Sequence, residues 1–229
     1  MAKNRIVKQH DERMDEILRT AQELFYSQGY ENTSIQMIID RIDIAKGTFY
    51  HYFSSKDDLL SAMTERVCVE VVDQVAGVVD GAGGTAIDKI NRFYGLSTEW
   101  KMANVDTVIA STKALYDDRN LLLRSRLAEN SIRFLSPILT AYIKQGVDEG
   151  LFFPSDPDHI GEVMLRLKVA IGERVMPMFF EIKDHPEHAE EISIGFSLYQ
   201  DSVERLLGVK PGTLNIFDPA EFKEKFGSR

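Results

Sequence analysis

The chain has 229 residues, a net charge of −9 and 44% hydrophobic residues, with one cysteine. This composition supports one small module and a larger core, and it excludes a disulfide framework within the chain. No run approaches the length of about 20 apolar residues that spans a bilayer. The N-terminus is polar and the single Cys68 has apolar neighbours, so we expect a cytoplasmic protein in which this thiol is buried.

The first element that the sequence predicts is an amphipathic helix that ends at Gly29, where a left-handed residue suits a helix C-terminus. Its apolar face is formed by Met14, Ile17, Leu18, Ala21, Leu24 and Phe25. Thr33 and Gln36 then have the spacing of a capping box, which predicts the start of a second helix. A tight break at Asp43-Ile44 ends this second helix.

Residues 46–53 form a short aromatic run that separates into two faces when it is drawn as a helix. Phe49 and Phe53 share the side that we expect to pack, whereas other positions present donors, aromatic edges and bare backbone. Such a run also occurs in ordinary cores. The two preceding helices favour the helix-turn-helix arrangement, in which the last helix enters the major groove of DNA.

Helix four is expected over about residues 55–79, beginning at Ser54 or Ser55, and the glycines of residues 77–84 predict the clearest break in the chain. Thr85 and Asp88 have the spacing to cap the next helix.

The remainder of the chain also has helical periodicity. We expect helices over residues 104–116 and 120–149, with Pro137 kinking or dividing the second of these. Asp156-Pro157 predicts the start of another helix, which Pro177 should bend or end. A long helix over residues 187–207 and a short one after Asp218-Pro219 complete an all-α fold.

Residues 13–62 resemble the DNA-binding region of the TetR family of transcriptional regulators. The resemblance is carried by several pieces in the same order and spacing, namely Leu24-Phe25, Gly29-Tyr30, Thr33-Ser34, the run from Lys46 to Phe53, and Ser55-Lys56-Asp57-Asp58-Leu59-Leu60.

Three features depart from the family pattern. Asp43 replaces the usual glycine of the bend, and Ala45 replaces a serine that can cap the recognition helix. Ile39 and Ile42 stand where small alanines are frequent, so we expect slightly wider spacing of the two helices. Asp tolerates a left-handed backbone better than most residues, whereas a lost N-cap typically costs about 1 kcal/mol.

This resemblance implies an N-terminal helix-turn-helix domain over residues 1–56 and a larger helical domain for regulation and dimerisation over residues 57–229. It also implies a homodimer through residues of about 157–208, in two helices predicted over 157–181 and 187–208. Their apolar stripes are Ile160, Val163, Met164, Leu167 and Ile171, and Ile192, Phe196, Tyr199, Val203 and Leu206. The alternative is that these stripes are buried within one subunit, which periodicity does not distinguish.

The predicted DNA-contacting residues lie on the short third helix and beside it. They are Thr33, Gln36, Lys46, Gly47, Thr48, Tyr50, His51 and Lys56. Among them, Thr33, Tyr50 and Lys56 suit phosphate contacts, and Thr33 has the alternative role of a helix cap. Residues 1–60 contain 8 Lys and Arg against 10 Asp and Glu, so we expect a site-specific binder of double-stranded DNA with low background affinity.

By the same resemblance, an unidentified small-molecule effector would bind in an apolar cavity of the larger domain. The candidate lining residues are Phe93, Trp100, Tyr116, Phe134, Tyr142, Met176 and Phe179, each with ordinary core packing as the alternative. We expect no cofactor, no metal, no membrane partner and no enzymatic activity, because the sequence lacks phosphate-loop, nucleophile-elbow and zinc motifs. The His185-Pro186-Glu187-His188 cluster suits an exposed loop better than a metal site.

The expected function is therefore ligand-responsive and sequence-specific transcriptional regulation, with repression that the effector relieves. The alternative is a helical cytosolic protein that binds a small molecule and has lost or weakened DNA binding, which the uncapped Ala45 and the acidic balance keep open.

Overall fold

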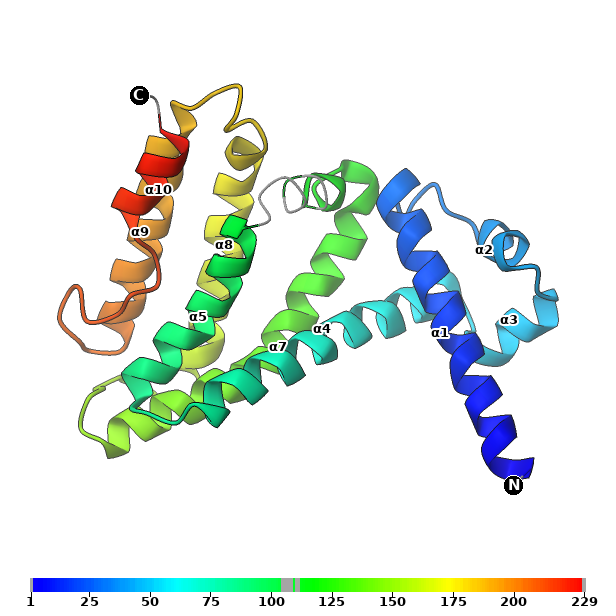
Figure 1. Cartoon of the computed structure of the whole chain (residues 1–229), viewed down its shortest axis with the longest axis horizontal. Coiled ribbons are helices and arrows are strands. Elements are labelled where there is room, and N and C mark those ends of the chain that lie inside the picture. Colours follow the sequence, from blue (N-terminus) through cyan, green and yellow to red (C-terminus); the bar gives the residue numbers. More distant parts are fainter. Residues whose placement is uncertain (1, 104–108, 110–111, 228–229) are drawn as a thin grey trace. The chain divides into compact units, whose positions relative to one another are not determined.

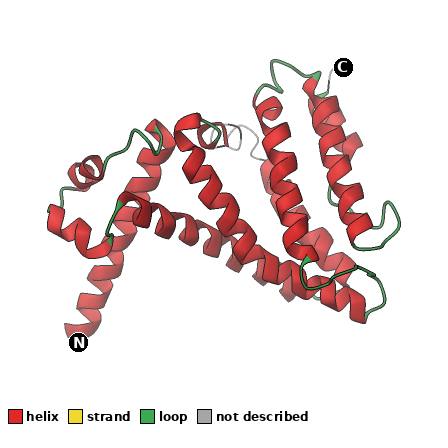
Figure 2. Ribbon diagram, turned by 180° about the vertical axis from the view of Figure 1, so that it is seen from behind, coloured by secondary structure: helices red, strands yellow, loops and turns green. Residues whose placement is uncertain are grey.

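The computed structural model describes residues 2–103, 109 and 112–227; the side chains of residues 2–10, Gln74 and 96–103 are outside this description. Within the described chain the regular structure is helical throughout, which confirms the all-α prediction (Figure 2). The helix expected over residues 104–116 falls largely outside the described residues.

The chain forms two compact units. Unit 1 combines residues 1–69 with residues 111–130, and unit 2 combines residues 70–110 with residues 131–229. This division differs from the one predicted at residue 56, because a later segment completes the N-terminal unit. We describe each unit by itself.

Unit 1 begins with α1 (Ala2–Gln28), which ends at Gly29 with a positive φ of 92°, as the sequence predicts. α2 (Ile35–Ile42) starts one residue later than expected. Its N-cap is Ser34, whose hydroxyl accepts a hydrogen bond from the Met37 amide at 3.2 Å. The predicted Thr33–Gln36 capping box is therefore wrong.

The bend between α2 and α3 (Lys46–Tyr52) is formed by Asp43 in the left-handed conformation, with φ 52° and ψ 54°. The Asp43 amide donates to the Ile39 carbonyl, so this residue takes the part that a C-terminal glycine usually plays. Ala45 is the N-cap of α3 and forms no side-chain capping bond, as expected. These two departures from the family pattern therefore preserve the helix-turn-helix.

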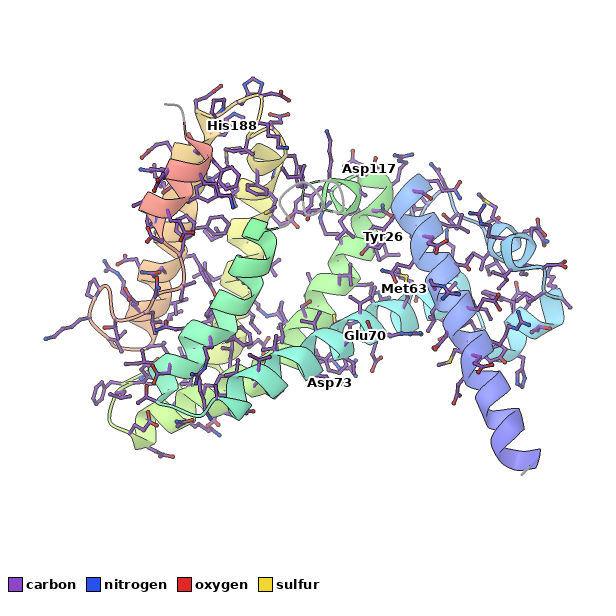
Figure 3. The ribbon with its side chains drawn as sticks, in the orientation of Figure 1. Tyr26, Met63, Glu70, Asp73, Asp117 and His188 are labelled. Atoms are coloured by element: carbon purple, nitrogen blue, oxygen red, sulfur yellow. The ribbon has the colours of Figure 1, made fainter. Side chains whose placement is uncertain are left out.

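A single apolar cluster holds the helices of unit 1 together. Met63 of α4 (Lys56–Gly81) lies within this cluster (Figure 3). The buried members are Ile17, Leu18, Ala21, Phe25, Tyr30, Ile38, Ile39, Phe49, Phe53, Leu59, Leu60, Met63 and Leu123. Leu123 belongs to α7 (Leu121–Asp148), which confirms that the core of this unit needs the later segment. Cys68 is buried, as expected.

The helix boundaries around the glycine-rich stretch differ in part from the prediction. α4 continues through Gly77 to Gly81, so the break is limited to the residues after Gly81. α5 (Ala86–Ala103) begins after Thr85, whose hydroxyl pairs with the Asp88 carboxylate at 2.7 Å, as predicted. A helix tolerates glycine when packing elsewhere along its length outweighs the entropy cost.

Proline positions also affect the helices of unit 2 less than expected. Pro137 lies inside α7 without dividing it, and Pro177 lies inside α8 (Ile160–Phe180), which continues to its predicted end. α8 begins at Ile160 instead of Pro157, because residues 157–159 form a turn. α9 (His188–Leu206) and α10 (Pro219–Phe226), which Asp218 caps, agree closely with the prediction.

Unit 2 packs α8 against α9 and α10 against α9 (Figure 1). One apolar cluster joins α5, α7, α8 and α9, and includes Ile90, Tyr142, Met164 and Val203. A second cluster joins the end of α8, the start of α9 and α10, around Phe222.

Candidate nucleic-acid interface

α3 has one buried face and one exposed face. Phe49 is 0% exposed and Phe53 is 4% exposed, so both contribute to the core of unit 1 as predicted. Tyr50 is 46% exposed, and Lys46, Gly47 and His51 are also exposed, whereas Thr48 is half-buried. The short helix is thus held from one side while the other side presents the side chains that a DNA groove requires.

The exposed face of α3 combines a cation, an aromatic ring and open backbone. The Lys46 ammonium lies 5.9 Å from the centroid of the Tyr50 ring, and that ring meets Phe49 edge-on at 5.5 Å. A Cβ added at Gly47 would meet no atom within 4 Å, so the backbone here is open to close approach. This surface can offer donors to phosphates and to base edges.

Gln36 lies in the first turn of α2, where it is exposed. Its side-chain amide donates to the Asp40 carboxylate at 2.7 Å. The two residues are one helical turn apart, which is the spacing at which such pairs form. Because this bond uses only the amide nitrogen, the Gln36 amide oxygen can accept a hydrogen bond from a DNA base.

Thr33 does not present a hydroxyl to solvent. The residue is 1% exposed, and its hydroxyl donates to the Gly29 carbonyl at 2.8 Å. The hydroxyl therefore closes the turn between α1 and α2. The predicted phosphate contact through this side chain is wrong, and so is the alternative role as a helix cap.

The Lys56 ammonium also forms contacts within unit 1. This ammonium donates to the Tyr30 carbonyl at 2.8 Å and to the Thr33 carbonyl at 3.0 Å, and it lies 4.1 Å from the centroid of the Tyr30 ring. Lys56 therefore anchors the start of α4 to the α1–α2 turn, and its predicted phosphate contact stays a prediction. The sequence distance of 26 residues between Lys56 and Tyr30 leaves no local signal for this contact.

The N-terminal region matches the family model described as bacterial regulatory proteins, tetR family, over residues 17–63. These are the residues that form the helix-turn-helix and its core. This region of the chain is a TetR-family DNA-binding region.

Two curated relatives match the N-terminal part of the chain. The uncharacterised HTH-type transcriptional regulator YvdT of Bacillus subtilis (strain 168) is 36% identical over 74 residues, which are 32% of this chain and 38% of YvdT. The HTH-type transcriptional repressor NemR of Escherichia coli (strain K12) is 28% identical over 86 residues, which are 38% of this chain and 43% of NemR. The chain therefore spans less than half the length of either relative.

A solved structure extends the likeness to the whole fold. The crystal structure of RolR in complex with resorcinol superposes with a TM-score of 0.57 at 18% identity, and the match covers 95% of this chain and 94% of RolR. At this identity the comparison supports the fold alone.

The candidate effector residues belong to more than one part of the structure. Phe93 and Tyr142 are buried in the cluster of α5, α7, α8 and α9, whereas Phe179 packs against Phe222 in the cluster at α10. Tyr116 belongs to unit 1, where Arg124 lies over its ring at 4.5 Å. Which of these residues line an effector site stays a prediction, because the described ones belong to more than one apolar cluster.

The other candidate effector residues add little to either cluster. Phe134 is half-buried with Arg133 lying 4.7 Å from its ring centroid, and Met176 is half-buried on α8. The side chain of Trp100 lies outside the described residues. Sequence reasoning selected large apolar residues, and those that are described occupy ordinary packing positions.

Two tyrosines of the unit 2 core hydrogen-bond to each other. The hydroxyls of Tyr94 and Tyr199 lie 2.6 Å apart, and Tyr199 donates to the Met164 carbonyl at 3.2 Å. Burial raises the pKa of both phenols, so each stays protonated. Burial and the nearby Asp80 carboxylate likewise raise the pKa of Tyr142 to about 12.

Half of the predicted dimer stripe is buried within unit 2. The five buried residues are Ile160, Met164, Ile192, Tyr199 and Val203, which agrees with the alternative of packing inside one subunit. Val163 of the predicted stripe is 44% exposed on α8, and two further apolar residues, Ile194 and Leu198, are 52% and 49% exposed on α9.

The described part of the chain contains no helix long and apolar enough to cross a membrane. Among the same residues, no group of three or more His, Cys, Asp or Glu side chains is arranged to hold a metal ion. His185 instead pairs with the Glu187 carboxylate at 3.0 Å and stacks on His188.

Proposed function

We propose that this chain is a sequence-specific DNA-binding transcriptional regulator that responds to a small molecule. The observation that carries the proposal is the division of α3, in which Phe49 and Phe53 are buried and Lys46, Tyr50 and His51 are exposed. The DNA contacts that we propose are Gln36, Lys46, Gly47, Thr48, Tyr50 and His51. The match to the family model and the names of the curated relatives support the same role.

We further propose that the chain acts as a homodimer through α8 and α9. The exposed apolar side chains Val163, Ile194 and Leu198 support this face as the one that a second copy covers. Two helix-turn-helix units in a dimer would read half-sites about 34–36 Å apart, or a multiple of that distance. Analytical ultracentrifugation should show a dimer, and Leu198→Glu should shift the equilibrium toward monomer.

Selection of bound sequences from a random duplex library tests DNA recognition directly. We expect the full chain to enrich an inverted repeat, because a two-fold dimer presents two identical reading heads. Replacement of both Lys46 and Tyr50 by Ala serves as the control and should abolish the enrichment. A wild-type chain that enriches no sequence would instead support a helical small-molecule-binding protein without DNA function.

A separate test must show whether the chain responds to an effector and whether that effector lowers or raises its affinity for DNA. RolR is titled as a complex with resorcinol, and NemR is named a repressor, which supports repression relieved by a ligand. A ligand can act only if it binds the two states of the protein with different affinities. We expect a screen of small apolar compounds against the selected duplex to identify one that lowers DNA affinity. Unchanged binding across the screen would contradict this part of the proposal.

A further inference from the structure

The α1–α2 turn of unit 1, defined here as residues 29–33, is held by side chains and backbone from distant parts of the sequence. The strongest contacts come from Asn120, which is 1% exposed and lies at the end of the 3-10 helix η1 (Asp118–Asn120). The Tyr30 amide donates to Asn120 Oδ1 at 2.7 Å, and Asn120 Nδ2 donates to the Phe25 carbonyl at 3.0 Å and to the Ala114 carbonyl at 2.9 Å.

These contacts use both the acceptor and the donor atoms of the Asn120 side chain. The amide oxygen accepts from one backbone group, while the amide nitrogen donates to two carbonyls, so the orientation of the amide is determined by its partners. Neither aspartate nor leucine of similar size can repeat this pattern, because one lacks the donors and the other lacks polar atoms. Buried groups left without partners cost more than an average hydrogen bond contributes.

The residue before Asn120 reinforces the same turn. The Arg119 carbonyl accepts from the Glu31 amide at 3.1 Å, and the Arg119 side chain packs where a Cβ at Gly29 would lie, at 2.5 Å. Arg119 is in turn held by Asp117, whose pKa it lowers to about 2 through a charged hydrogen bond. Asp117 is labelled near the start of α7 in Figure 3.

The turn leads directly into α2, and α2 leads through Asp43 into α3. Because α2 and α3 have 8 and 7 residues, they are too short to hold their own orientation and depend on their surroundings. The geometry points to Asn120 as a positioning residue for DNA binding, acting through the α1–α2 turn. This inference rests on the proposed function.

The test compares the full wild-type chain with Asn120→Ala, Asn120→Asp and a matched control, Asn130→Ala. Asn130 lies in α7, the helix that follows η1, also within unit 1, and its amide donates to the Thr64 hydroxyl at 2.9 Å, away from the turn. For each chain, the affinity for the selected duplex is divided by the affinity for an unrelated duplex of equal length. Hydrogen exchange of residues 25–33 is measured in parallel.

We expect Asn120→Ala to lower this affinity ratio by roughly tenfold and to speed exchange in residues 25–33, because the reading helix loses its defined orientation. Binding to the unrelated duplex should stay unchanged, since phosphate attraction does not require that orientation. Asn120→Asp keeps the size and the acceptor and should show the same loss, which covers the case in which the alanine variant does not fold. Asn130→Ala should keep the wild-type ratio and the wild-type exchange.

An Asn120→Asp chain with a wild-type affinity ratio would overturn the inference, as would an equal loss of the ratio in Asn130→Ala. A uniform fall in both affinities would also overturn it, because that pattern indicates lost folded protein. If the wild-type chain selects no duplex, the proposed function fails and the inference about DNA positioning fails with it. Faster exchange at residues 25–33 in that case would still show that Asn120 holds the turn.

Discussion

The two units of the molecule are stabilised in different ways. Unit 1 contains the short helices α2 and α3, and its buried polar residues Thr33 and Asn120 hydrogen-bond to backbone in the α1–α2 region. Unit 2 contains the longer helices α8 and α9, of 21 and 19 residues, which join through extended apolar clusters. A short helix gains little from its own hydrogen bonds, so side chains must determine its place. Loss of a polar side chain should therefore destabilise unit 1 in addition to loss of packing, whereas unit 2 should respond mainly to changes in packing.

The largest effect expected in unit 2 is that of a packing change. A Cβ at Gly146 of α7 would overlap the ring of Phe152, which is buried. We expect Gly146→Ala to lower the free energy of unfolding by about 3 kcal/mol, measured by chemical denaturation, because the ring has no space to move into. Gly77→Ala is the matched control, since a Cβ there meets nothing within 4 Å. That variant should gain about 0.5–1 kcal/mol, and equal stability of the two variants would contradict the packing argument.

A smaller effect is expected at Lys56 in unit 1. Lys56→Gln removes a cation that donates to the Tyr30 and Thr33 carbonyls, so the free energy of unfolding should fall by about 1–2 kcal/mol. Lys46→Gln should leave stability unchanged and reduce the salt dependence of DNA binding by about one counterion. Thermal unfolding and salt titrations distinguish the two lysines. If Lys56→Gln instead reduced the salt dependence of DNA binding and Lys46→Gln lowered stability, Lys56 would be the lysine that contacts DNA.

Tyr50 tests the exposed face of α3. We expect Tyr50→Ala to weaken operator binding by about tenfold and to leave folding intact, because the ring is 46% exposed. Phe49→Ala is the contrast, since its ring is 0% exposed and its loss should cost about 3–5 kcal/mol of stability. Fluorescence anisotropy with a labelled duplex measures the first effect. Wild-type affinity in the Tyr50 variant would place this face away from DNA.

The smallest expected effect concerns pH and the turn before α9. The hydrogen bond to Glu187, followed by the charges of Glu187, Glu181 and Asp184, raises the pKa of His185 above its ordinary value of 6.5. A raised pKa means that the folded state favours the protonated ring, so the stabilisation is present below pH 6.5 and disappears as pH rises through the folded pKa.

NMR titration of the imidazole measures this pKa directly. His185→Asn should lower the unfolding temperature slightly at about pH 5.5 and leave it unchanged at about pH 8.5. His188, at the start of α9 in Figure 3, provides the reference ring in the same spectra. A midpoint at or below 6.5 for His185 would contradict the geometry of its contact with Glu187.

The sequence by itself determined the all-α fold, the end of α1 at Gly29, the left-handed Asp43 and the two faces of α3. These features depend on the identity and spacing of residues within one or two turns of helix, which the chain reveals directly. The start of α10 after Asp218 was predictable for the same reason. Errors at this level were local, as when Ser34 became the N-cap that we had assigned to Thr33.

Only the tertiary structure decided where the polar side chains of unit 1 are used and which apolar residues of unit 2 meet. Asn120 lies 90 residues from Tyr30 in sequence, and no local pattern marks their contact. Lys56 and Thr33 turn inward because backbone carbonyls of a buried turn need donors. In unit 2, both apolar clusters draw aromatic residues from helices, so periodicity alone does not separate the residues of one cluster from those of the next.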